Sequence, residues 1–433
     1  MSAKIFSVLC SLMLFHTTAA ARVVISNVDV LTMASATLLR DRVVIVEDGT
    51  ISEVIDRRDF EPLSDDQLID GQGGVLMPGL VDSHVHIDHP QDLRMMALYG
   101  VTSAINMRGL PWHLELRNTI RSESIFAPDF ITGGDYLDGS PPDMLPMASV
   151  ADEAAARRSV QTWKAAGYDF IKIYSELSAA QYRAICDEAR KLQIAVIGHL
   201  LDDASLDDVL TCPQYNIAHG EQLFKLLESR TDPVEIRALL KALSEQNITL
   251  TTNRQLYREM GRQPAELDQL LARPESAVIH PATFQPWRPG INRYARRDDA
   301  WAGRVQQVYE DLAQINRIAQ DVDPGMLVAG SDMPVAGSYP GVSLIDEIEA
   351  FHESGLDAYQ ALATATRNAA KLVATLSPDY PKVGVIQCGA RADLLLLESN
   401  PAENLGKLRT PRGVMLRGRW YPADDLAAIR SKM

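Results

Sequence analysis

Two histidines separated by one residue are the first sign of chemistry in this chain. His84 and His86 lie in VDSHVHIDHP (81–90), directly after MPGL, and the apolar Val85 between them is typical of the end of a β-strand. Side chains two residues apart on a strand point to the same side. Because neutral imidazole is a common zinc ligand, the pair predicts half of a metal site.

Four more side chains with metal-binding or proton-transfer chemistry end apolar runs of the same kind: Lys172 in DFIKIYS, His199 in IAVIGHL, His219 in YNIAHG and Asp332 in AGSDMP. If these runs are parallel strands of a barrel, their carboxyl ends open onto one face, where active sites of that architecture lie. Each residue alone has a structural explanation, as a buried histidine, a lysine extending from a strand end or a helix-capping aspartate. Their joint occurrence at strand ends favours one pocket.

The segment that positions these residues reads as repeated strand and helix. Between about Pro78 and Leu376, short apolar runs precede amphipathic stretches, as in IAVIGHL before DASLDDVL. Its length is near the ~250 residues typical of a (β/α)₈ barrel, although a doubly wound open sheet gives a similar pattern. Residues 22–77 and 377–433 read instead as short strands and are expected to pair in one small β-domain. The region from Arg273 to Pro289 is expected to be a long loop that could cover the site.

The charge balance limits the class of partner. The chain has 433 residues, of which 42 are basic and 57 acidic, and its formal net charge is −15. Without basic runs, it is not expected to bind nucleic acid through phosphates. A small-molecule partner is expected, and a homo-oligomer is compatible with the sequence.

Residues 1–21 have the pattern of a secretory signal peptide: Lys4, an apolar segment from Ile5 to Phe15, and small residues before Arg22. The apolar segment is shorter than the ~20 residues that cross a bilayer, so no membrane anchor is expected after cleavage. The mature protein is expected in the periplasm or outside the cell. The remaining cysteines are odd in number and widely spaced, so they are expected to be buried apolar residues without a disulfide framework: Cys186, Cys212 and Cys388.

Six segments together carry a family resemblance. In order, MPGLVDSHVHIDHP, IKIYS, IGHL, IAHG, AGSDMP and GARADLLLLESNP resemble the metal-dependent amidohydrolase superfamily over essentially the whole mature chain. Within it, the chain looks like the secreted binuclear subgroup with a bridging carboxylated lysine, related to dipeptidases and imidazolonepropionase. The resemblance implies a (β/α)₈ TIM barrel over 78–376 and a β-sandwich built from 22–77 and 377–433.

The resemblance also implies a role for each strand-end residue: His84 and His86 on the more buried metal, His199 and His219 on the more exposed metal, N6-carboxylated Lys172 bridging both, and Asp332 at the buried metal and the attacking water. A free ammonium cannot ligate a cation, so the lysine role requires a carbamate. Two divalent ions are implied. Zinc is the default for such N and O ligands, with manganese, cobalt or iron as alternatives.

These groups predict hydrolysis. Two cations that share a water make hydroxide available near neutral pH, and Asp332 takes the proton and returns it to the leaving amine. The expected reaction is cleavage of an amide or peptide bond in a dipeptide or N-acyl amino acid, as in a metallopeptidase. A hydrolase of cyclic amides, lactones or phosphotriesters is the alternative. A non-catalytic periplasmic binding protein, or a site in which one metal serves only stability, are further alternatives.

Residues for substrate binding are weakly encoded, because they lie in loops. Tyr174 shares a side with Lys172 and could donate to a developing oxyanion. Arg254 and Tyr257, in TTNRQLYREM, could receive a substrate carboxylate. His280, in the long loop, is either a pocket residue or part of the surface.

Overall fold

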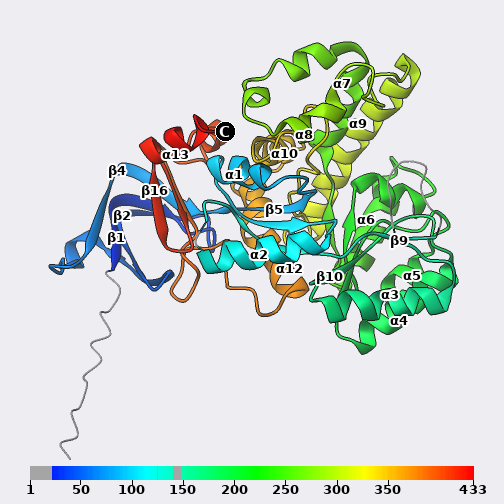
Figure 1. Cartoon of the computed structure of the whole chain (residues 1–433), viewed down its shortest axis with the longest axis horizontal. Helices are drawn as coiled ribbons and strands as arrows, with labels where there is room; N and C mark the ends of the chain where they lie inside the picture. The colour runs from blue at the N-terminus through cyan, green and yellow to red at the C-terminus, as the bar shows by residue number, and fades with distance from the viewer. Residues whose placement is uncertain (1–21, 124, 140–147) are drawn as a thin grey trace, which may run out of the picture.

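The computed structural model describes residues 22–123, 125–139 and 148–433, and the predicted signal peptide, residues 1–21, lies outside these ranges. Strands and helices alternate between two sheet-forming chain ends (Figure 1). No described helix has the length and apolar character needed to cross a bilayer. The described chain is a mixed α/β protein.

Both chain ends contribute to one seven-stranded sheet, ordered β16-β15-β14-β4-β1-β2-β3. Its strands are β1 (Val23–Leu31), β2 (Leu38–Glu47), β3 (Thr50–Asp56), β4 (Gln67–Pro78), β14 (Leu394–Leu397), β15 (Gly413–Leu416) and β16 (Arg419–Pro422). In Figure 1 the blue strands lie beside the red β16. The long β4 joins the two chain ends, because it pairs with β1 along one edge and with β14 along the other. Side chains of β1, β2, β14 and β15 share one buried core.

The remaining strands are parallel and form two groups. One group has the order β5-β6-β7, with β5 (Leu80–Val85), β6 (Val101–Asn106) and β7 (Asp129–Thr132). The other has the order β13-β12-β11-β10-β8-β9, with β8 (Leu137–Asp138), β9 (Ala148–Ser149), β10 (Phe170–Ile173), β11 (Ala195–Gly198), β12 (Gln214–Ala218) and β13 (Thr249–Thr251). Most of these strands are buried along their whole length, as expected for parallel strands covered on both faces.

Single parallel bridges connect the two groups. Gly133, just after β7, pairs with Phe170 of β10, and Leu250 of β13 pairs with Leu327. Residues 326–333 then reach β5, where Met333 pairs with Val85. These bridges bring the ends of β5, β10, β11, β12 and β13 toward one another across the stretch 326–333.

Helices follow the strands, and several of them begin at a side chain that caps the first turn. They are α1 (Pro90–Leu98), α2 (Pro111–Glu123), α3 (Glu153–Ala166), α4 (Ala179–Lys191), α5 (Leu206–Thr211), α6 (Pro233–Glu245), α7 (Arg254–Leu271), α8 (Pro281–Phe284), α9 (Asp299–Val322), α10 (Val342–Glu353), α11 (Ala358–Ala363), α12 (Ala369–Leu376) and α13 (Ala423–Arg430). In α4, for example, Ser178 and Gln181 form a capping box.

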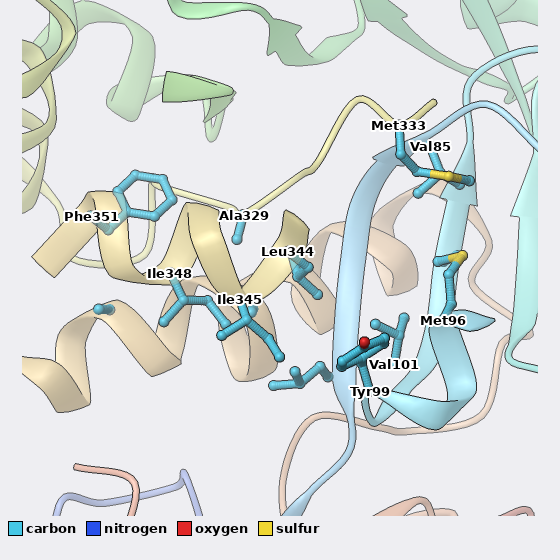
Figure 2. Packing of buried hydrophobic residues seen from close by; sticks show 14 of the residues in the cluster. Val85, Met96, Tyr99, Val101, Ala329, Met333, Leu344, Ile345, Ile348 and Phe351 are labelled. Carbon is cyan, nitrogen blue, oxygen red and sulfur yellow. The ribbon is translucent and has the colours of Figure 1, made fainter. Parts of the chain in front are cut away.

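The largest apolar core lies against β5 and the stretch 326–333. Figure 2 shows Met333 close to Val85, above a layer that includes Ile345 and Ile348 of α10. All four side chains are buried. Because His84, His86 and Asp332 are direct sequence neighbours of Val85 and Met333, this packing fixes the backbone that carries them.

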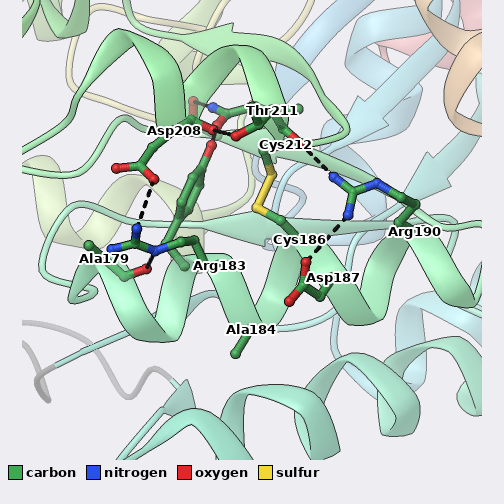
Figure 3. The surroundings of a disulfide bond; sticks show 12 residues. Ala179, Arg183, Ala184, Cys186, Asp187, Arg190, Asp208, Thr211 and Cys212 are labelled. Carbon is green, nitrogen blue, oxygen red and sulfur yellow. Dashed lines mark hydrogen bonds and ion pairs between the residues drawn. A yellow bond between two sulfur atoms is a disulfide. The ribbon is translucent and has the colours of Figure 1, made fainter.

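The expectation for two of the cysteines is wrong, because Cys186 of α4 and Cys212, just after α5, form a disulfide (Figure 3). Their Cα atoms are 5.1 Å apart although the residues are 26 positions apart in sequence. Polar contacts join the same two segments: Arg190 donates to Thr211 O at 2.5 Å, and Arg183 pairs with Asp208 at 3.6 Å. The pairing depends on how α4 packs against α5, which cysteine spacing does not reveal. Cys388 forms no disulfide, as expected, but its side chain is exposed, so the expectation of burial is wrong for this residue as well.

Candidate metal centre

Adjacent backbones hold three of the predicted ligands together. His84 lies in β5 and His86 follows it, so both face the same side. Asp332 N donates to His84 O and His86 N donates to Met333 O, each at 2.8 Å. Asp332 has a left-handed backbone with φ 49°, which turns its carboxylate toward the two imidazoles. Its Oδ1 lies 3.1 Å from His84 Nε2 and 3.0 Å from His86 Nε2.

The other three predicted ligands come from consecutive strands. Lys172 lies in β10, His199 follows β11 and His219 follows β12. The imidazole of His219 joins the two groups: its ring centroid lies 4.8 Å from that of His84 and 4.9 Å from that of His199. The side chain of Lys172 is fully buried, and its Nζ lies 5.7 Å from the centroid of the Tyr174 ring, which stacks on His199. The structure therefore brings the strand-end residues to one place.

Several nitrogens at this place are buried without a hydrogen-bond partner. They are both ring nitrogens of His84, His199 Nε2 and Lys172 Nζ. The contact of His84 Nε2 with Asp332 is short, but it is not aligned as a hydrogen bond. A buried donor or acceptor without a partner costs about 1–3 kcal/mol, so a cluster of them indicates a site that a ligand can satisfy. His84, His86 and Asp332 already offer ligand atoms that lie within 4.8 Å of one another. The side chains fit a divalent metal ion.

Burial shifts the ionisation of these groups toward ligand-competent forms. Burial lowers the pKa of His199 well below the ordinary value, which keeps this imidazole neutral. Burial also lowers the pKa of His84, against the attraction of Asp332. It lowers the pKa of Lys172 to about 7, against the attraction of Asp332. Burial alone would raise the pKa of Asp332, but the adjacent His84 and His219 hold that pKa well below the usual range. The site thus combines neutral nitrogen donors with one ionised carboxylate, and a neutral lysine amine can react with carbon dioxide.

Tyr136 supports His86 and was not singled out from the sequence. Its hydroxyl lies 2.8 Å from His86 Nδ1, and its side chain is buried. A partner on the second ring nitrogen fixes the orientation and tautomer of a metal-ligating histidine. Applying the strand-end rule to the segment after β7 as well would have drawn attention to Tyr136.

A cavity of about 410 Å³ opens above Asp332 and His86. Its other lining residues are Asp88, Arg108, Tyr136, Tyr174, Thr283, Pro286, Trp287, Ile291, Asn292, Arg293, Tyr294, Pro334, Val335 and Ala336. Residues 283–294 form much of this wall. Thr283, Pro286 and Trp287 of the predicted loop 273–289 lie in this wall. The segment is not the irregular loop that the sequence predicts, because it contains α8 and two short 3-10 helices.

Of the four substrate-binding candidates, Tyr174 lies in the cavity wall. Its ring stacks on His199 with centroids 3.9 Å apart. Tyr257 is buried and donates its hydroxyl hydrogen bond to Glu221. His280 caps α8 and stacks on His89 at 3.4 Å. Neither Tyr257 nor His280 is among the described residues that line the cavity.

Arg254 lies elsewhere than expected. Its guanidinium donates to Tyr309 O at 3.0 Å and to Ala350 O at 2.9 Å, and it packs over the Tyr309 ring. Arg254 takes this position because its backbone is fixed at the start of α7. There the buried Glu347 accepts hydrogen bonds from the backbone N–H groups of Arg254 and Gln255. This anchors Arg254 against α9 and α10, so its expected role as a carboxylate receptor is corrected.

No protein-family model and no curated protein sequence matches the chain. Solved structures do match it over nearly its full length. A bottromycin amidohydrolase has a TM-score of 0.72 at 21% identity and covers 94% of this chain and 88% of its own. A Xaa-Pro dipeptidase with bound methionine in its active site has a TM-score of 0.70 at 18% identity, covering 93% and 100%. The A. niger ochratoxinase has a TM-score of 0.67 at 17% identity, covering 94% and 96%. The chain therefore has the fold of these hydrolase structures, as the resemblance implies.

Proposed function

We propose that this protein is a metal-dependent amidohydrolase that cleaves an amide or peptide bond in a small molecule. The observation that carries the proposal is the cluster of buried, unpartnered nitrogens of His84, His199 and Lys172 beside the Asp332 carboxylate, beneath a cavity. The hydrolase names of the structural neighbours support the same reaction class. The bridged parallel strands are proposed to be a (β/α)₈ barrel with its site at the carboxyl ends of the strands.

The proposed centre is binuclear, with zinc as the default ion. His84 and His86 would hold one ion, His199 and His219 the other, and Lys172, carboxylated on its amine, both. When bound, divalent ions lower the pKa of a shared water toward about 7 and polarise the scissile carbonyl.

Asp332 is proposed as the general base and then the general acid. It is held in the ionised form by the imidazoles beside it, and it lies in the cavity wall, where a substrate can reach it. It would accept the proton of the attacking water and return this proton to the leaving amine. Tyr174, also in the wall, is proposed to donate to the oxygen of the scissile carbonyl as charge develops there.

Export is part of the proposal. The signal-peptide pattern of residues 1–21 and the disulfide between Cys186 and Cys212 both favour an oxidising compartment, such as the periplasm or the medium.

The test combines metal analysis with a substrate panel. The protein is loaded with zinc, manganese or cobalt, its metal content is measured by mass spectrometry, and dipeptides, N-acyl amino acids, lactones and phosphotriesters are assayed. We expect binuclear loading, hydrolysis of amide substrates, and a carbamate ¹³C signal after equilibration with labelled bicarbonate. His199→Gln should lose metal, whereas the control His352→Gln, on α10, should keep it. Tight ligand binding without metal or turnover would instead favour the binding-protein alternative.

A further inference from the structure

One guanidinium group in the cavity has no part in the proposed hydrolytic chemistry. Arg108 follows β6 and lines the same cavity as His86 and Asp332. Its side chain is 21% exposed, so it is mostly enclosed but accessible from the cavity. Because Arg254 packs against Tyr309, Arg108 replaces it as the candidate for recognising an anion.

Arg108 is held in place beside Tyr136, the residue that contacts the proposed metal ligand His86. Its Nε donates to Asp135 Oδ1 at 3.0 Å, and this carboxylate oxygen also accepts from Tyr136 N at 3.0 Å. The guanidinium carbon of Arg108 lies 5.5 Å from the centroid of the Tyr136 ring, whose hydroxyl contacts His86. A single aromatic side chain thus separates the guanidinium from a ligand of the proposed metal centre. Such a fixed guanidinium needs little reorganisation to bind a planar anion.

The covering segment adds a second positively charged side chain to the cavity. Arg293 and Tyr294 line the cavity from the covering segment. Asn292 anchors this segment: its Nδ2 donates to Gln263 Oε1 at 2.9 Å, and its Oδ1 accepts from Tyr294 N at 2.9 Å. The described lining contains two arginines and two aspartates, one of which, Asp332, is assigned to the metal centre. Metal ions at that centre would make the cavity still more favourable for an anion.

We infer that Arg108 binds a substrate carboxylate adjacent to the scissile amide, so that the substrate is an N-acyl α-amino acid or a peptide cleaved at its C-terminal residue. This inference rests on the proposed function and specifies its substrate class. A guanidinium group can donate two parallel, charge-assisted hydrogen bonds to the two oxygens of one carboxylate. In an α-amino acid the carboxylate is close to the amide nitrogen, which suits a guanidinium placed one side chain away from His86. The apolar wall of Trp287, Ile291 and Val335 would contact the amino-acid side chain.

The experiment compares each carboxylate substrate with its C-terminal carboxamide in the metal-loaded protein. We expect Arg108→Gln to raise KM for the carboxylate about 10- to 100-fold, with little change in kcat, and to leave the carboxamide unaffected. Arg108→Lys should recover part of the lost affinity for the carboxylate, because lysine keeps the positive charge but cannot donate two parallel hydrogen bonds. Arg288→Gln is the matched control, since Arg288 is exposed on the covering segment and does not line the cavity.

A binding measurement separates this inference from the proposed function. The released amino acid and its carboxamide are titrated calorimetrically into metal-loaded wild-type and Arg108→Gln protein. Preference for the carboxylate that disappears in Arg108→Gln supports the inference even if no amide is hydrolysed. An equal loss of kcat for both substrates would overturn it, because Arg108 would then act by positioning Tyr136 and His86. Loss of the preference in Arg293→Gln instead of Arg108→Gln would overturn it as well.

Discussion

The side of the candidate centre formed by β5 and residues 326–333 differs from the side formed by β10, β11 and β12. On the β5 side, polar groups are joined to one another: backbone hydrogen bonds link Asp332 to His84 and His86 to Met333, and Tyr136 contacts His86. On the β10 side, Lys172 Nζ and His199 Nε2 are buried without partners.

The two sides of the candidate centre are therefore positioned in different ways. The β5 side is positioned by contacts within the protein and can keep its geometry alone. The β10 side has groups that only a ligand can satisfy, and it carries the disulfide on its outer helices, where Cys186 of α4 is bonded to Cys212 after α5. We expect metal binding to stabilise the second side more than the first.

The largest effect is expected from Asp332→Asn, on the β5 side. The amide keeps the shape of the side chain but cannot accept the proton, so kcat should fall by about 10²- to 10⁴-fold. Metal content, measured by mass spectrometry, should fall much less, because the histidine ligands remain. Asp203→Asn, at an exposed position after β11, is the control. Full activity in Asp332→Asn would remove this residue from the role.

Removing the disulfide tests how much the outer helices on the β10 side contribute to stability. Cys186→Ser with Cys212→Ser should lower the free energy of unfolding by about 3–4 kcal/mol, since the cross-link closes a loop of 26 residues. Urea unfolding of the metal-free protein measures this change. Cys388→Ser should have little effect, and three free thiols in the unfolded, unreduced mature protein would contradict the disulfide.

Lys172→Met tests the unpartnered amine directly. In the metal-free protein, replacing a buried amine without a partner by an apolar side chain should raise the free energy of unfolding by about 1–3 kcal/mol. Added metal should stabilise wild type but not the variant. Tyr136→Phe is the matched change on the β5 side: it removes a hydroxyl that has a partner, and should lower stability by about 1 kcal/mol. Loss of stability in both metal-free variants would mean that the two sides do not differ in this way.

The smallest effect concerns pH and His113 of α2, which contacts the β5 side. Its Nδ1 accepts from Leu110 N and its Nε2 lies 2.8 Å from Ile87 O. Burial lowers the pKa of His113, so the unfolded chain binds a proton below about pH 6.5 that the folded protein excludes. Stability should therefore fall as the pH drops through this range, by up to about 1.4 kcal/mol per pH unit. His113→Gln should reduce this slope in urea titrations, and an unchanged slope would contradict the assignment. His352→Gln is the control.

The sequence predicted the centre better than its surroundings. Histidine, lysine and aspartate at the ends of apolar runs are rare enough to be recognised, and all six came together. Tyr136 and Arg108 also follow strands, but tyrosine and arginine have many structural uses, so the residue type does not mark them as part of a site. Arg254 was misplaced because its contacts with Tyr309 and Ala350 depend on helix packing, and the disulfide was missed for the same reason.

The continuity of β4 with β5 has a consequence for how the site is completed during synthesis. Pro78 ends β4 and Leu80 begins β5, with Gly79 N donating to Asp393 O between them. The strand that carries the first two proposed ligands is thus an extension of β4, whose last residues, Val75–Pro78, pair along one edge with β14 more than 300 residues later. A nascent chain still attached to the ribosome exposes that edge until its last segment emerges. Contacts of such long sequence separation form slowly, so the final assembly of the centre is a post-translational event that an unfinished or C-terminally clipped chain does not reach.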